Sequence, residues 1–178
     1  MAEQGDFIEE SIAELEKESA PRVFDEKMLT EPLSVLSPSE PVVVETQTSA
    51  LEAIGLMQEH SLGCVVVVRS GKIKGIFSER DVLTRIVGRG VDAAKMPVRK
   101  VMTANPETLR VTDSIAYGLN LMSIGGYRHI PLVDAAGTPV GVISVKDIIG
   151  YLVDFFPKSI LNLPTMPRGN YAREREGA

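Results

Sequence analysis

The chain contains two copies of one sequence pattern, and this internal repeat constrains the fold more than any other feature. The copies align at a shift of 65 residues, which becomes 66 after one extra residue in a turn. Identical residues recur at corresponding positions, so we expect two units of similar structure. The matched pairs are Pro41 and Pro106, Ser49 and Ser114, Leu56 and Leu121, Met57 and Met122, Val68 and Val133, Gly71 and Gly137, Gly75 and Gly141, Ser78 and Ser144, and Asp81 and Asp147.

Each copy is predicted to run strand, helix, strand, strand, helix. Apolar residues at three- and four-residue spacing indicate the helices, and consecutive apolar residues indicate strands that are buried on both faces. The predicted fold class is therefore α+β, with the order β-α-β-β-α in both copies. The expected segments are 42–44, 50–57, 64–68, 73–77 and 79–87 in the first copy, and 108–111, 114–124, 129–133, 140–143 and 145–155 in the second.

The repeats divide the chain into five parts. At the N-terminus we expect a charged helix over 6–19, with Ile8, Ile12 and Leu15 on one face. This helix either covers an apolar surface or frays in solvent, and the sequence favours neither. The parts are an N-terminal helical extension at 1–27, the first copy at 28–90, a linker at 91–98, the second copy at 99–157 and a C-terminal tail at 158–178.

Composition excludes several classes of protein. Of the 178 residues 44% are hydrophobic, which is enough to bury a core and excludes a disordered chain. The net charge of −5 provides no uniform positive field, so we expect no nucleic acid partner. The apolar runs are too short to span a bilayer and the N-terminus lacks the pattern of a signal peptide, so we expect a cytoplasmic protein without a membrane partner. The single cysteine, Cys64, lies in an apolar run and is interpreted as a core residue rather than a nucleophile.

One motif follows the third predicted strand of both copies: Gly, two apolar residues, Ser, two residues and Asp. It runs from Gly75 to Asp81 in the first copy and from Gly141 to Asp147 in the second. Ser followed three residues later by an acidic residue is also the sequence of a helix capping box, which satisfies free amides of the first turn. Because the motif recurs at the same place in both copies, we expect it to do more than cap a helix.

With these motifs and the stretches 101–106 and 127–134, the chain resembles a tandem pair of cystathionine-β-synthase (CBS) domains, often called a Bateman module. The resemblance covers residues 29–156. It implies two repeats related by a pseudo-twofold axis, with two clefts that bind adenosine-containing ligands. It also implies a regulatory protein rather than an enzyme, which forms a homodimer and signals to an effector protein.

The chemistry of the motif residues fits a nucleotide ligand. A carboxylate in the first helical turn accepts both hydroxyls of a ribose, a role that falls to Asp81 and Asp147. A serine at a helix N-terminus beside a cation suits phosphate. The predicted phosphate or ribose contacts are Ser78, Arg80, Ser144, Lys146 and Arg128. By the resemblance, the adenine pockets consist of Thr46, Gln47, Gly63, Cys64, Val65, Val111, Thr112, His129, Ile130 and Pro131.

The two copies are not equal. The second has Arg128-His129-Ile130-Pro131 ahead of and within its second strand, where the first has Gly63-Cys64-Val65-Val66, so equal occupancy is not expected. No metal site is predicted, because His60 and His129 lack Cys or His neighbours at ligand spacing.

Two functional hypotheses follow. The leading one is a regulatory module that binds AMP, ADP, ATP, S-adenosylmethionine or an NAD-type dinucleotide and signals to a separate effector in trans. The alternative is a structural or dimerisation module with empty clefts, whose motifs are helix caps only. An enzyme is not expected, since no general base and nucleophile can be paired, and no cofactor is required.

Overall fold

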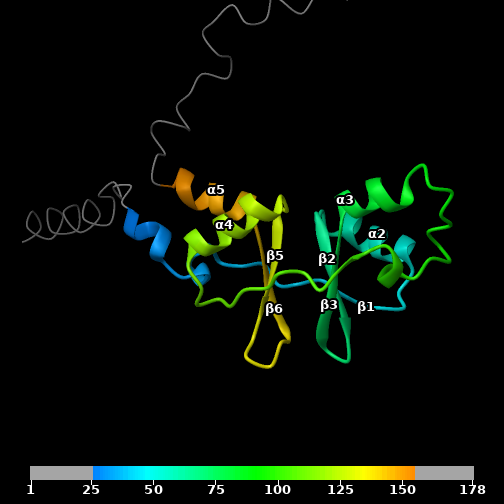
Figure 1. Ribbon diagram of the computed structural model, residues 1–178, viewed down its shortest axis with the longest axis horizontal. Coiled ribbons are helices and arrows are strands. Elements are labelled where there is room, and N and C mark those ends of the chain that lie inside the picture. The colour runs from blue at the N-terminus through cyan, green and yellow to red at the C-terminus, as the bar shows by residue number, and fades with distance from the viewer. Residues whose placement is uncertain (1–25, 155–178) are drawn as a thin grey trace, which may run out of the picture. The chain divides into compact units, whose positions relative to one another are not determined.

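The computed structural model describes residues 26–154, of which 26–151 form one compact unit. The helix expected at 6–19 and the tail at 158–178 lie outside the described residues. The short helices η1, η2 and η4 are 3₁₀-helices, and η3 is a π-helix. In chain order the elements are η1 (Glu26–Thr30), η2 (Leu33–Leu36), β1 (Val43–Glu45), α2 (Ala50–Glu59), β2 (Cys64–Arg69), β3 (Lys72–Ser78), α3 (Glu79–Asp81), η3 (Val82–Ile86), η4 (Val98–Lys100), β4 (Thr103–Ala104), α4 (Ile115–Gly125), β5 (His129–Val133), β6 (Pro139–Ser144) and α5 (Val145–Val153) (Figure 1).

The first copy forms a four-stranded sheet in the order β1-β2-β3-β4. β1 runs parallel to β2, whereas β3 is antiparallel to both β2 and β4. The first five residues of β2 are buried, as their consecutive apolar side chains predict for an interior strand. Ala50, Ala53 and Met57 of α2 share a hydrophobic core with Phe77 of β3. The same core includes Val98, Val101 and Met102, which follow the first copy in sequence.

The second copy pairs β5 with β6, and the strand expected at 108–111 is not formed. A single parallel bridge joins Leu109 to Leu132 in its place. The Arg110 amide donates a 2.7 Å hydrogen bond to Asp113 Oδ2, and this turn ends the extended segment directly after Leu109. The apolar pattern still predicted the burial of Leu109, which is 4% exposed.

The helix expected at 79–87 is also irregular. It consists of the single α-helical turn α3 followed by the π-helix η3. The Thr84 hydroxyl donates to the Arg80 carbonyl at 2.7 Å, a side-chain bond that competes with regular helix geometry. Val87 is extended and Gly88 has a φ of 70°, so the helical segment ends at Ile86.

The segment that precedes each copy in sequence packs against the other copy in space. Pro32 forms an antiparallel bridge with Ser114, and the corresponding residues Pro97 and Ser49 form the same bridge. Further on, Ser39 bridges to Val142 of β6, just as β4 pairs with β3. Residues 28–40 thus complete the second copy, and the linker, taken as residues 91–107 because the pairing continues through β4, completes the first. Two copies related by a pseudo-twofold axis require such reciprocity, and the axis itself stays a prediction.

Because the linker packs closely on β3, we expect Gly75 to tolerate no larger side chain. A Cβ atom at this position would lie 2.2 Å from Sδ of the buried Met102, which precedes β4. We expect Gly75→Ala to lower the free energy of unfolding by about 1–3 kcal/mol through overpacking, measured by urea denaturation. The control is Gly55→Ala in α2, where a Cβ meets nothing within 4 Å and we expect stabilisation by about 0.5–1 kcal/mol. An unchanged midpoint for Gly75→Ala would contradict the close packing of the linker.

Candidate functional site

The repeated motif forms the same hydrogen bonds in both copies. The amide and hydroxyl of Ser78 donate to Asp81 Oδ2 at 2.9 and 2.8 Å. The amide and hydroxyl of Ser144 donate to Asp147 Oδ2 at 2.7 and 2.8 Å. One oxygen of each carboxylate therefore fixes the junction between a strand and the following helix, which is the capping interaction that the sequence predicts.

The second oxygen of Asp81 is engaged as well. Oδ1 accepts a 3.0 Å hydrogen bond from the Thr103 hydroxyl and forms a 3.3 Å ion pair with Nε of Arg85. Arg85 also donates to the Met102 carbonyl, so this cluster joins η3 to the linker. Asp81 is 4% exposed, and its buried charge is matched on both oxygens.

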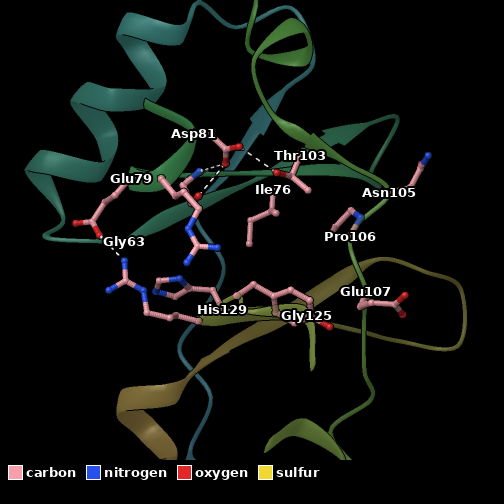
Figure 2. Close-up of a pocket in the computed structure, with 14 residues that line it drawn as sticks. Gly63, Ile76, Glu79, Asp81, Thr103, Asn105, Pro106, Glu107, Gly125 and His129 are labelled. Carbon is pink, nitrogen blue, oxygen red and sulfur yellow. Dashed lines mark hydrogen bonds and ion pairs between the residues drawn. The ribbon is translucent and has the colours of Figure 1, made fainter. Parts of the chain in front are cut away.

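A first cavity, of about 350 Å³, lies beside Asp81. The first copy contributes the end of β3 and the start of α3, and the linker contributes the residues from Thr103 to Glu107. Figure 2 shows Asp81 and Thr103 on one side of this cavity and His129 and Gly125 of the second copy on the other. The lining residues are Gly63, Ile76, Ser78, Glu79, Arg80, Asp81, Thr103, Asn105, Pro106, Glu107, Gly125, Tyr127, Arg128 and His129.

A second cavity, of about 390 Å³, has the corresponding construction with the copies exchanged. The start of α5 takes the place of α3, residues 39–42 take the place of the linker, and 61–64 take the place of the segment ahead of β5. The two cavities share Gly63, Glu79, Arg128 and His129. The lining residues are Ser39, Glu40, Val42, Ser61, Leu62, Gly63, Cys64, Glu79, Arg128, His129, Val142, Ser144, Val145, Lys146 and Asp147.

The shared wall between the cavities carries charge and one close contact. Arg128 Nη2 lies 3.8 Å from Glu79 Oε2, an exposed ion pair between the copies. Burial lowers the pKa of His129, Arg128 lowers it further, and Glu79 and Asp147 oppose this shift. A Cβ at Gly63 would lie 2.7 Å from His129 Cε1, so only glycine accommodates the ring in this position.

Arg80 forms a further link between the copies. Its Nη1 donates to the Gly126 carbonyl, at the C-terminal end of α4, over 2.7 Å. Arg80 also lines the first cavity, as does Arg128. The guanidinium groups of Arg80 and Arg128 therefore line the first cavity together with the carboxylates of Glu79, Asp81 and Glu107, so the cavity presents both signs of charge.

The structure brings most of the predicted polar residues to the cavities. The residues of the prediction that line a cavity are Ser78, Arg80, Asp81, Arg128, Ser144, Lys146, Asp147, Gly63, Cys64 and His129. Those of the prediction that line neither cavity are Thr46, Gln47, Val65, Val111, Thr112, Ile130 and Pro131.

Burial and strand direction explain why these adenine-pocket residues lie elsewhere. Val65, Ile130 and Pro131 are fully buried within their strands. Thr46 and Gln47 follow the end of β1, whereas the second cavity is lined by Glu40 and Val42, which precede it. The sequence analysis missed these lead-in residues and their counterparts from Asn105 to Glu107. The matched prolines Pro41 and Pro106 were the signal for both segments.

Other kinds of site find no support in the described residues. Residues 26–154 contain no group of three His, Cys, Asp or Glu side chains that could hold a metal ion. In the same range no helix is long and apolar enough to cross a membrane. Of the two histidines, His129 alone lines a cavity.

A family model described as CBS domain matches the chain twice, over residues 34–88 and 98–154. A 17.7 kDa protein from Acidianus ambivalens is 29% identical over 146 residues, which cover 82% of each chain. A CBS domain-containing protein from Arabidopsis thaliana is 31% identical over 155 residues. This match covers 81% of the present chain and 28% of the Arabidopsis protein, so the chain spans under a third of that relative.

Solved structures have the same fold. A CBS-domain containing protein from Agrobacterium tumefaciens superposes with a TM-score of 0.61 at 29% identity, covering 67% of this chain and 95% of that one. A CBS domain protein from Pyrobaculum aerophilum, complexed with AMP, gives 0.63 at 23% identity and covers 71% and 98%. A CBS domain pair in complex with 5′-methylthioadenosine and S-adenosyl-L-methionine gives 0.61 at 21% identity and covers 68% and 98%.

The environment of Cys64 predicts an inert thiol, although this residue lines the second cavity. Burial raises the pKa of the Cys64 thiol to about 12, with a smaller contribution from the negative charge of Glu79. We expect its reaction with Ellman's reagent at pH 8 to be at least about a hundredfold slower in the native protein than in guanidinium chloride, because the thiolate is the reacting species. Equal rates in the two conditions would contradict the interpretation of Cys64 as a core residue.

Proposed function

Since the chain belongs to the CBS domain family and carries two such domains in tandem, we propose that it is a regulatory module that binds an adenosine-containing ligand and catalyses no reaction. One observation carries the proposal: each cavity combines the Ser-x-x-Asp motif of one repeat with two segments of the other repeat. These are residues 103–107 and 125–129 in the first cavity, and residues 39–42 and 61–64 in the second. A ligand in either cavity therefore contacts both repeats. The AMP and S-adenosyl-L-methionine complexes of structural neighbours support this class of ligand.

Within each cavity we assign roles by chemistry. The carboxylate of Asp147 suits the ribose, and the same role for Asp81 requires Arg85 or Thr103 to move. Cationic groups suit phosphate: Arg80 in the first cavity, Lys146 in the second, and Arg128 in both. Ser78 and Ser144 lie beside these cations, but their hydroxyls donate to Asp81 and Asp147 and would have to turn to donate to a phosphate. AMP, ADP, ATP, S-adenosylmethionine and NAD-type dinucleotides all present the required ribose.

We further propose that the module is a cytoplasmic homodimer that signals to an effector protein in trans. The evidence for a second copy is apolar surface on helical segments: Leu83 of η3 is 67% exposed and Ile149 of α5 is 54% exposed. These two residues occupy corresponding positions in the repeats. Ile124 at the end of α4 is 78% exposed. Apolar groups that recur on helices of both repeats suit a self-complementary interface.

The alternative function is a structural or dimerisation module with empty cavities. The hydrogen bonds between Ser78 and Asp81, and between Ser144 and Asp147, favour it because they account for the motif by capping alone. Ligand binding distinguishes the two functions.

Thermal unfolding with a ligand panel tests the proposed function. A ligand at about 100 times its Kd stabilises the native state by roughly 2.7 kcal/mol, which raises Tm by about 5–10 °C for a chain of this length. We expect this rise with at least one of AMP, ADP, ATP, S-adenosylmethionine and NAD at millimolar concentration. Ribose 5-phosphate at the same concentration is the control, and it should give a smaller shift because it lacks adenine. If no adenosine compound moves Tm, the structural alternative holds.

Light scattering tests the homodimer. We expect a mass twice that of the chain at micromolar concentration, and we expect the double variant Leu83→Asp/Ile149→Asp to be monomeric because it places carboxylates in the proposed interface. Val140→Asp is the control, since Val140 is 46% exposed but lies on β6 rather than on a helix. A monomeric parent, or a dimer that survives the double substitution, would rule out this interface.

A further inference from the structure

The two motif aspartates have different surroundings, and the repeat alignment explains the difference. Asp81 Oδ1 is held by Arg85 and Thr103. The residues that correspond to these two donors in the other half of the alignment are Tyr151 and Pro38. Neither replaces them: the Tyr151 hydroxyl donates to Glu31 Oε2 at 2.5 Å, and proline has no polar hydrogen.

Asp147 consequently keeps one oxygen open. Its Oδ2 accepts the two bonds from Ser144, and no donor among residues 26–154 reaches its Oδ1. The described part of the chain contains no buried side-chain oxygen without a partner, so Oδ1 is reached by solvent. Asp147 also lines the second cavity, so the open oxygen is available to a ligand there.

The hydrogen-bonding capacity of a carboxylate turns this difference into selectivity. Two carboxylate oxygens provide about four acceptor positions. Asp81 uses its positions on Ser78, Thr103 and Arg85, and Figure 2 shows its carboxylate directed at Thr103. A vicinal diol in the first cavity would have to displace one of these donors from a buried charge. A diol in the second cavity meets an acceptor for which residues 26–154 provide no competing donor.

We propose that the two cavities recognise nucleotides differently. The second cavity selects for a ribose with both hydroxyls through Asp147, whereas the first cavity does not recognise the diol and holds a nucleotide through its anionic group, with Arg80 and Arg128. The first cavity therefore binds deoxynucleotides as well as ribonucleotides. This inference rests on the proposed binding of adenosine compounds and adds which of the two sites distinguishes their sugars.

The test uses AMP and 2′,3′-dideoxyadenosine 5′-monophosphate, which lacks both ribose hydroxyls. Nuclear magnetic resonance titration of the ¹⁵N-labelled chain gives one Kd for each cavity, with the amides of Ser144 and Ser78 as reporters. At Ser144 we expect the dideoxy compound to bind about ten- to hundredfold more weakly than AMP, the loss for bonds to a charged acceptor. At Ser78 we expect equal affinities.

Two substitutions locate the source of the selectivity. Asp147→Asn should weaken AMP at the Ser144 reporter to the level of the dideoxy compound, because a neutral amide replaces the charged acceptor. Thr103→Val, the matched change beside Asp81, removes a donor from Oδ1 and should create a preference for AMP at the Ser78 reporter. This variant keeps Asp81 charged and partnered by Arg85, so it tests the first cavity without leaving a buried carboxylate unpaired.

The outcomes distinguish this inference from the proposed function. Equal AMP preference at both reporters, or a preference at Ser144 that survives Asp147→Asn, would overturn the inference and leave nucleotide binding intact. A parent chain that binds neither nucleotide would overturn the proposed function and the inference together. Preference confined to Ser144 and abolished by Asp147→Asn would establish the difference between the cavities.

Discussion

The exchange of lead-in segments between the two repeats is the constraint on which the rest of the structure depends. Leu33 packs against the second repeat and Val98 against the first, at corresponding positions, and both are fully buried. Each such burial contributes about 1.5–3 kcal/mol that a single repeat could not obtain from its own residues. The same exchange places residues 39–42 beside the motif of the second repeat, and residues 103–107 beside the motif of the first. The cavities are therefore a property of the pair, and neither repeat forms one alone.

The sequence predicts what depends on repetition and apolar periodicity, and it misses what depends on single polar contacts. The burial of β2 and the position of β5 follow from consecutive apolar residues. The strand expected at 108–111 is reduced to a single bridge because the Asp113 carboxylate turns the chain after Leu109. A pattern of apolar residues cannot reveal this contact. At the cavities, the motif predicted the positions of Asp81 and Asp147. It did not predict that Glu40 and Asn105 line the cavities, because the sequence does not show which end of a strand faces the other repeat.

A buried charge without partners is costly, and this explains why Asp81 and Asp147 differ both in burial and in the residues around them. Asp81 is buried, and a carboxylate out of water must have donors on both oxygens, which Arg85 and Thr103 provide in addition to Ser78. In the other repeat, Tyr151 and Pro38 stand at the positions of Arg85 and Thr103, and the carboxylate of Asp147 stays within reach of water. One pair of differences between the repeats thus ties up the second oxygen of Asp81 and leaves that of Asp147 open, without altering the motif itself.

The two cavities share one wall, and this wall carries charged side chains. Gly63, Glu79, Arg128 and His129 face both cavities, and the contact of the His129 ring with Gly63 leaves no room for another side chain between them. Arg128 pairs with Glu79, and its charge adds to burial in lowering the pKa of His129, while Glu79 and Asp147 oppose that shift. Both members of this ion pair are more than half exposed, so solvent screens the attraction between them. The two cavities therefore draw on the same ion pair and the same imidazole rather than on two independent sets of charged groups.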